Sequence, residues 1–151
     1  MSGRIIGIDP GPGQSAMVVV EAGVPVPGSD VWLANGELRR TLFQESGALL
    51  AIEYMEKQGK RRVVGRSVFD TLCWIGRFIE IWEGPYLLLM RRAIRAHIGG
   101  SARATGPDVL RALKERVGPK WATSPHLWSA LAVALTAHEA PERGFRLEDR
   151  R

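Results

Sequence analysis

Short apolar runs separated by turn residues dominate the first half of the chain. The runs Arg4–Asp9 and 15–22 are divided by prolines and glycines, which favours an antiparallel pair of strands. A third strand is expected over Val31–Ala34. The run 48–53 is apolar on both faces, as in a central strand that helices cover on each side. The pattern predicts a sheet built mainly from this half of the sequence.

Helical periodicity follows in the second half. Apolar residues recur at three- and four-residue spacing over 68–82, which predicts an amphipathic helix with one face on the sheet. Tyr86–Met90 is expected to be a short buried strand. Further helices are expected at 37–45, 107–117 and 125–137. This order of elements predicts a mixed α/β sheet with helices on both faces.

Length and composition fit one globular domain. The chain has 151 residues, of which 45% are hydrophobic and 25% charged, and no apolar run is long enough to cross a membrane. The start of the sequence lacks the plan of a signal peptide, so we expect a cytoplasmic protein without membrane contact. Cys73, the single cysteine, and Trp32 are expected to be buried. We place the domain at residues 1–140 and a polar, frayed tail at 141–151.

The charge balance is compatible with nucleic acid binding and with an ordinary basic surface. Lysine and arginine number 21 against 16 aspartate and glutamate, which gives a formal net charge of +5. Most of these cations are arginines, whose guanidinium groups bind phosphate in a bidentate fork. Charge alone leaves both interpretations open.

Asp9 and Glu53 end the two most apolar strands and are the first candidates for chemistry. If these strands are parallel neighbours, both carboxylates emerge at the same edge of the sheet, where ligands of α/β proteins bind. Two close anionic oxygens suit Mg²⁺ or Mn²⁺, with water and a substrate phosphate completing the coordination. The alternative is that each carboxylate only ends its strand at the surface.

Four segments carry a further pattern: residues 6–12 (IGIDPGP), 51–53 (AIE), 95–112 and 129–136. In this order they resemble the motifs of the RuvC-type Holliday junction resolvases, and the compact length resembles phage and prophage members. The resemblance implies a ribonuclease-H-like fold and a metal-dependent endonuclease that cuts four-way DNA junctions. It also implies a role in DNA recombination and repair in the cytoplasm of a bacterial or phage-infected cell.

The resemblance assigns metal ligands residue by residue. Asp9 and Glu53 match the first two metal-binding acids of the family, which implies a Mg²⁺ cofactor with Mn²⁺ as a substitute. Ser129 stands where the family usually has an aspartate, so His126, one helical turn earlier, becomes the expected third ligand. The alternative for this histidine is a bond to backbone groups at the start of its helix. Asp70 is the reserve carboxylate, and whether one or two metal ions bind stays open.

Basic residues complete the predicted site. The resemblance makes Arg95 and Arg103 catalytic support beside the scissile phosphate. Contacts to branched DNA are expected from cations after Glu53 and around a Gly–Ser turn: Lys60, Arg61, Arg62, Arg66, Arg91, Arg92, Arg95, Ser101 and Arg103. The alternative for each cation is a surface charge that takes no part in binding.

Two functions remain as hypotheses. The first is a structure-selective endonuclease, for which a homodimer with one active site per subunit suits the two symmetric strands of a junction. The second is a junction-binding protein of the same fold, catalytically weakened because Ser129 replaces the aspartate. The retained carboxylates of Asp9 and Glu53 favour the first. An actin-like ATPase also begins with such a strand, but 151 residues exclude all but a fragment of one.

Overall fold

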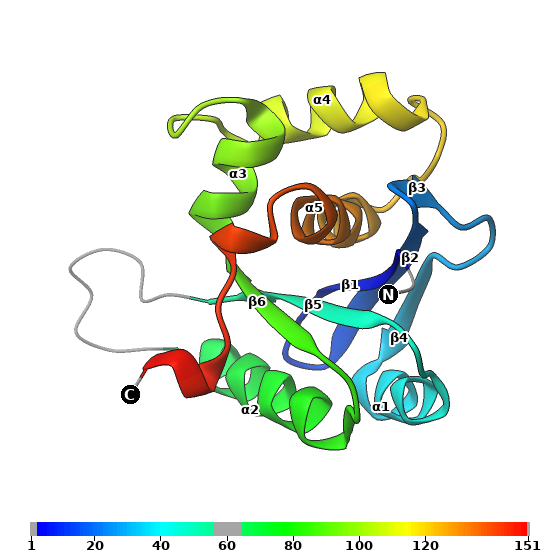
Figure 1. Ribbon diagram of the computed structural model, residues 1–151, viewed down its shortest axis with the longest axis vertical. Coiled ribbons are helices and arrows are strands. Elements are labelled where there is room, and N and C mark those ends of the chain that lie inside the picture. Colours follow the sequence, from blue (N-terminus) through cyan, green and yellow to red (C-terminus); the bar gives the residue numbers. More distant parts are fainter. Residues whose placement is uncertain (1–2, 56–64, 151) are drawn as a thin grey trace.

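A mixed sheet forms the centre of this computed structural model, which describes residues 3–55 and 65–150 (Figure 1). In these residues the sheet has six strands: β1 (Arg4–Asp9), β2 (Gln14–Glu21), β3 (Val24–Pro25), β4 (Val31–Ala34), β5 (Leu49–Tyr54) and β6 (Tyr86–Met90). The order is β3-β2-β1-β5-β6, with β4 also paired to β2. β1 runs antiparallel to β2 and parallel to β5, and β5 runs parallel to β6. The predicted mixed sheet is confirmed.

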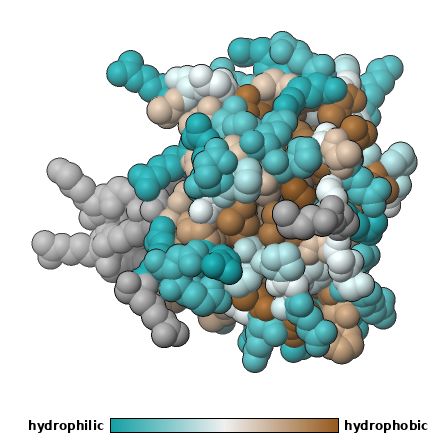
Figure 2. All heavy atoms as spheres, in the orientation of Figure 1, coloured by the Kyte–Doolittle hydropathy of each residue, from teal (hydrophilic) through white to brown (hydrophobic). Residues whose placement is uncertain are grey.

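Helices cover both faces of the sheet, as the order of the elements predicts (Figure 1). The helices are α1 (Asn35–Gln44), α2 (Arg66–Ile81), α3 (Arg91–Gly99), α4 (Gly106–Val117) and α5 (Pro125–Glu139). α1 and α2 pack on one face around Leu42 and Phe78. α5 packs on the other face, and α3 and α4 cover it in turn through Ile98 and Leu113. Figure 2 shows hydrophilic side chains over the outer helices and apolar side chains gathered between the layers.

α5 lies directly against β1 because Gly7 has no side chain. A Cβ atom at Gly7 would stand 2.4 Å from the carbonyl oxygen of Ala130 and 2.7 Å from the Cβ of Ala134. α5 is buried throughout residues 130–137, because the sheet covers one side and the outer helices cover the other. This close contact holds the first turn of α5 at the carboxyl end of β1. No helix in the described part of the chain is long and apolar enough to cross a membrane.

Three details differ from the expectations. The helix α3 was not predicted, because two arginines open it and only Ile94 and Ile98 are buried within it. Residues 141–150 do not fray: Phe145 exchanges backbone hydrogen bonds of 2.8 and 2.9 Å with Leu88. Cys73 is exposed rather than buried, because it lies on the outer side of α2. For α3 and the tail the sequence pattern was too short or too mixed to predict these contacts, whereas Cys73 lies just outside the buried stripe of α2.

Candidate active site

Asp9 and Glu53 lie next to each other at the carboxyl edge of the sheet. β1 and β5 are parallel and pair Ile8 with Ile52, so the two acids occupy the next position in each strand. Side chains alternate along a strand, so both acids are on the α5 side, as Gly7 is. Their side chains are 13% and 9% exposed. The predicted arrangement of two strand-end carboxylates on parallel neighbours is confirmed.

The environment of Asp9 disturbs the ionisation of this carboxylate. The pKa of Asp9 is raised from 3.8 to about 6. Burial of this carboxylate is the largest cause, and the negative charge of Glu53 adds to the rise. The hydrogen bond and charge of His126, together with the charge of Arg91, act in the opposite direction without cancelling it. Ionised Asp9 is therefore held at an energetic cost that a cation at this position would relieve.

His126 reaches Asp9 from the first turn of α5. Its Nδ1 atom lies 3.0 Å from Asp9 Oδ2, and its ring stacks on that of Trp32 with centroids 4.2 Å apart. The indole Nε1 of Trp32 donates a 2.7 Å hydrogen bond to Gln14 Oε1, which orients the indole. Ser124 caps the helix by accepting a hydrogen bond from the backbone N–H of His126. The imidazole is thus directed at the carboxylate rather than at the backbone of its own helix.

Trp32 takes a position that the sequence did not indicate, whereas Ser129 lies near Asp9 and His126. Trp32 is 38% exposed, so the expectation of a core residue is wrong: β4 pairs only with β2, and its indole covers the imidazole of His126. The hydroxyl of Ser129 donates a 3.1 Å hydrogen bond to the carbonyl of Pro125 within α5. Ser129 therefore lies beside the carboxylates without contributing an anionic ligand.

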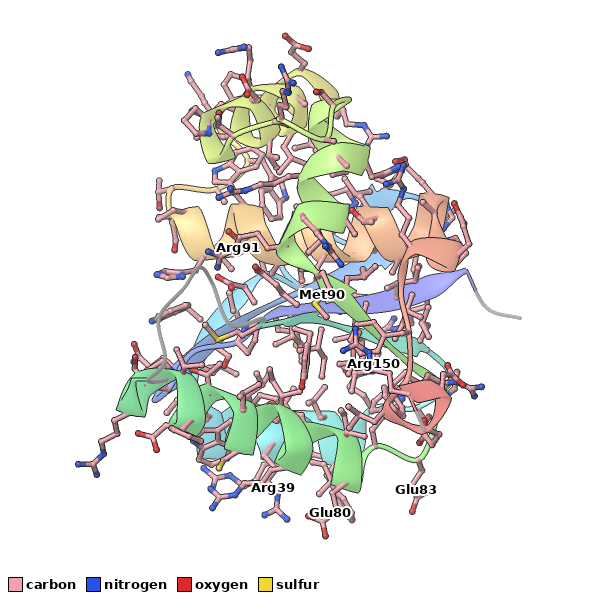
Figure 3. The ribbon with its side chains drawn as sticks, turned by 90° about the vertical axis from the view of Figure 1, so that its left-hand side faces the viewer. Arg39, Glu80, Glu83, Met90, Arg91 and Arg150 are labelled. Carbon is pink, nitrogen blue, oxygen red and sulfur yellow. The ribbon has the colours of Figure 1, made fainter. Side chains whose placement is uncertain are left out.

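Arg91 forms an ion pair with Glu53. It is the first residue of α3, directly after Met90, which pairs with Tyr54 at the end of β5 (Figure 3). Its Nε atom donates a 2.7 Å hydrogen bond to Glu53 Oε1. The charge of Glu53 and this hydrogen bond raise the pKa of the guanidinium. The sequence analysis assigned Arg91 only to DNA binding. Its place at the carboxyl end of β6, the strand next to β5, could have indicated an ion pair with Glu53.

Asp9, Arg91, His126 and Ser129 line one cleft of about 670 Å³, whereas Glu53 is paired with Arg91 and is not itself among the lining residues. The cleft is lined by residues 10–13 and by Asp9, Gln14, Trp32, Met55, Ser67, Thr71, Arg91, Pro125, His126 and Ser129. Its lining includes the carboxylate of Asp9, the guanidinium of Arg91 and the aromatic ring of Trp32. A cleft with both an anionic and a cationic group can accept a phosphodiester together with a divalent ion.

The donor atoms of the cleft fit a hard divalent cation. Mg²⁺ is usually bound by one or two carboxylates and keeps several waters or phosphate oxygens as its other ligands. Asp9 and Glu53 could supply the two carboxylates. Among the described residues, no three His, Cys, Asp or Glu side chains come together in a geometry that could hold a metal ion. The reserve candidate Asp70 pairs with Arg66 at 3.8 Å, has a half-exposed side chain and does not line the cleft.

The other predicted basic residues are found on more than one element. Arg95 is one turn after Arg91 on α3, and its guanidinium lies near the backbone of Gly106, where α4 begins. Ser101 and Arg103 form the turn between these helices, with the N–H of Arg103 donating to the Ser101 hydroxyl at 3.1 Å. Of the other residues predicted to contact DNA, some are described by the structure and some are not. Arg92 and Arg66 are exposed near the starts of α3 and α2, whereas Lys60, Arg61 and Arg62 lie outside the described residues.

The sequence matches no protein-family model and no curated protein. Two solved structures are similar to this chain over nearly its whole length. One is of Thermus thermophilus RuvC, with a TM-score of 0.63 and 20% identity over 92% of this chain and 96% of that one. The other is of T. thermophilus RuvC in complex with a Holliday junction substrate, with a TM-score of 0.66 and 17% identity over 93% and 97%. The chain therefore has the ribonuclease-H-like fold of RuvC.

Proposed function

We propose that this protein is a metal-dependent endonuclease that cuts four-way DNA junctions, of the compact kind found in phages and prophages. The observation that carries the proposal is the pair of carboxylates, Asp9 and Glu53, at adjacent parallel strand ends beside a cleft. The same fold in T. thermophilus RuvC holds a Holliday junction substrate, which supports branched DNA as the ligand. The net charge of +5 supports an anionic partner.

The residues of the candidate site have distinct roles in this proposal. Asp9 and Glu53 would hold Mg²⁺ or Mn²⁺, which supplies Lewis acidity toward a phosphodiester and lowers the pKa of a bound water. His126, whose ring stacks on Trp32, is the proposed third ligand; its ring would have to turn from Asp9 toward the ion, because the described residues hold no ready group of three such donors. Arg91 and the arginines that follow it on α3 would bind the backbone of the DNA. Arg95 and Arg103 remain the proposed support at the scissile phosphate.

The alternative is a junction-binding protein with weakened cleavage. Its support is Ser129, whose hydroxyl is engaged with Pro125 and adds no negative charge to the site. Against it stand Asp9 and Glu53, because an ionised carboxylate that is largely buried beside another one destabilises the fold. A protein that only grips phosphate has no use for two such groups, so we favour the endonuclease.

A labelled four-way junction tests the two functions directly. Incubation with Mg²⁺ should give paired nicks near the branch point, and EDTA should prevent them. The Glu53→Gln variant should bind the junction without cutting it, because neither carboxylate grips phosphate. A gel shift without cleavage in the wild type would select the alternative function. If a linear duplex of the same sequence bound and was cut equally well, junction selectivity would be wrong.

We also propose that the active form is a homodimer, because a symmetric junction presents two equivalent strands. The outer side of α2 supports this assembly: Phe69 is 57% exposed, Cys73 is exposed, and no other element of the described chain lies within 4 Å of the Cβ position of Gly76. An exposed aromatic ring beside small residues permits close packing of two such helices. Sedimentation of the DNA-free protein should therefore give twice the mass of one chain.

Substitutions at the two α5 positions test the third ligand. His126→Ala should weaken metal affinity, because this ring is the nearest donor to Asp9 outside the sheet. His126→Asp should retain activity, and Ser129→Asp should raise activity at low Mg²⁺, because each supplies an anionic oxygen. Cleavage rates across a Mg²⁺ titration measure these effects. Full activity of His126→Ala at limiting metal would show that the site uses Asp9, Glu53 and another carboxylate.

The salt dependence of junction binding tests whether the arginines on α3 and in the turn after it contact DNA. If arginines neutralise phosphates, the logarithm of junction affinity should fall linearly with the logarithm of salt concentration, by ~0.9 per contact. Arg95→Ala or Arg103→Ala should make this slope shallower by about one contact. The control is Arg39→Ala, which removes the same charge from α1 on the other face of the sheet (Figure 3). Equal slopes in all variants would mean that these cations do not touch DNA.

A further inference from the structure

We propose that Arg91 is an exchangeable counter-ion of Glu53, which competes with a divalent cation for this carboxylate and moves to a phosphate when DNA binds. This inference rests on the function proposed above. Its consequence is that metal and DNA bind cooperatively, and that part of their coupling depends on a single guanidinium. Arg91 is held by an ion pair with Glu53, is about half exposed and lines the cleft.

The ion pair places a positive charge where a metal ion would need to be. Arg91 Nε lies 2.7 Å from Glu53 Oε1, and the Glu53 side chain is only 9% exposed, so this carboxylate has little contact with water. A cation shared by Asp9 and Glu53 needs an oxygen of each. Arg91 occupies one oxygen of Glu53, and its charge would repel a divalent ion at the other. The guanidinium must therefore withdraw, or the metal must bind more weakly.

Arg91 is also able to leave. Its side chain is 48% exposed, it lines the cleft, and it sits at the first position of α3, where the helix imposes few constraints. Among the described residues, Glu53 is the only hydrogen-bond acceptor of this guanidinium. The two terminal Nη groups remain free of such partners in that part of the chain. A guanidinium binds phosphate through two parallel N–H groups, so a phosphodiester in the cleft offers Arg91 a second anionic partner.

These properties predict a coupling between the two ligands. DNA draws Arg91 away from Glu53 and thereby raises the affinity for metal. By linkage, metal at Glu53 releases Arg91 and raises the affinity for DNA by the same factor. A purely structural ion pair predicts the reverse for the DNA-free protein: loss of Arg91 would loosen the site and weaken metal binding. The sign of the effect on metal affinity therefore separates the two roles.

The first measurement is Mn²⁺ binding to the full, DNA-free chain, by calorimetry or by the paramagnetic signal of free Mn²⁺. Arg91→Met keeps an unbranched side chain without charge and should bind Mn²⁺ at least about fivefold more tightly, at the lower end of the usual range for coupled ligands. Arg91→Lys keeps the charge and should resemble the wild type. Arg95→Met is the matched control, because it removes the same charge one turn further along α3 and should change Mn²⁺ affinity less than Arg91→Met.

The second measurement is the coupling itself. Junction affinity is determined by fluorescence anisotropy in EDTA and in Ca²⁺, which takes the same oxygen ligands, with the junction verified as intact afterwards. The gain in affinity from Ca²⁺ should be smaller in Arg91→Met than in the wild type, by the factor found for Mn²⁺. If Arg91→Met does not fold, Arg91→Gln serves instead, because it can still donate to Glu53 without a charge.

The outcomes separate this inference from the proposed function. If Asp9→Asn abolishes Mn²⁺ binding while Arg91→Met leaves it unchanged or weaker, the exchange at Glu53 is wrong and the metal site stands. If Asp9→Asn leaves Mn²⁺ binding unchanged, the metal site is wrong and the role of Arg91 falls with it. If Arg95→Met tightens Mn²⁺ binding as much as Arg91→Met, the effect comes from the loss of any nearby positive charge and not from an exchange at Glu53.

Discussion

Asp9→Asn is expected to stabilise the folded protein by about 2–3 kcal/mol at pH 7–8 and at the same time to abolish metal-dependent cleavage. The stabilisation follows from the pKa of Asp9, which is raised to about 6 by burial and by the charge of Glu53. At neutral pH the wild type carries this unfavourable negative charge, whereas asparagine is neutral and can still accept the hydrogen bond from His126. A group that weakens the fold and is retained is expected at a functional site.

The pH dependence has a definite sign. The folded protein binds the Asp9 proton more tightly than the unfolded chain, whose carboxyl has its ordinary pKa of 3.8. The stability from this proton is fully present below about pH 4 and is lost as the pH rises through 6. The difference in free energy of unfolding between Asp9→Asn and wild type should therefore grow between pH 4 and pH 7 and then level off.

Urea denaturation at several pH values measures this difference. Asp70→Asn is the matched control, because its carboxylate is half-exposed on α2 and should change stability by less than about 0.5 kcal/mol, with cleavage retained. For Asp9→Asn, the loss of cleavage should exceed the roughly 10–100-fold that removal of an outer partner of a metal ligand costs. Cleavage within tenfold of wild type, or lower stability at pH 8, would contradict the two-carboxylate site.

Gly7→Ala is expected to destabilise the protein by about 3 kcal/mol or more, through overpacking against α5. The added methyl group would stand 2.4 Å from the carbonyl oxygen of Ala130 and 2.8 Å from the backbone nitrogen of Ala134. Both atoms belong to the helix backbone, so no side-chain rotation relieves the clash and α5 as a whole must move. The same movement would carry His126 away from Asp9.

Stability and site geometry should therefore change together in Gly7→Ala. Urea denaturation measures the first, and Mn²⁺ affinity of the fraction that folds measures the second. Gly36→Ala is the control, because no other described element lies within 4 Å of its Cβ position in the first turn of α1, and it should be as stable as the wild type or more stable by about 0.4–1 kcal/mol. A Gly7→Ala variant as stable as the control would mean that α5 is held less closely to β1.

Elements with a long or regular pattern could be predicted from the sequence. The helix at Arg66–Ile81 shows an apolar stripe at helical spacing, and the run that became β5 is apolar on both faces, as a central strand requires. Two elements, β3 and α3, could not be predicted. β3 has two residues, and α3 follows β6 without a turn, so neither leaves a period long enough to identify.

The candidate site divides in the same way. Asp9 and Glu53 were predictable because a carboxylate at the end of an apolar strand is a local feature, and parallel pairing brings such ends together. The pairings of Arg91 with Glu53 and of Trp32 with His126 were not, because they join residues 38 and 94 positions apart. The sequence contains many arginines and several tryptophans, and the residues next to each in the sequence do not show which arginine and which tryptophan reach the site.

By itself, then, the sequence determined the α/β class, the two carboxylates and the histidine one turn before Ser129, because these depend on hydrophobic periodicity and on the identity of residues at strand and helix ends. Tertiary structure alone decided which cation stands on Glu53, which ring covers His126 and how closely α5 approaches β1. These features depend on the distances between elements, and those distances follow from the absence of a side chain at Gly7 and from the register of the parallel strands. The sequence shows which residues are charged or aromatic, but the packing of helices on the sheet determines which of them are in contact.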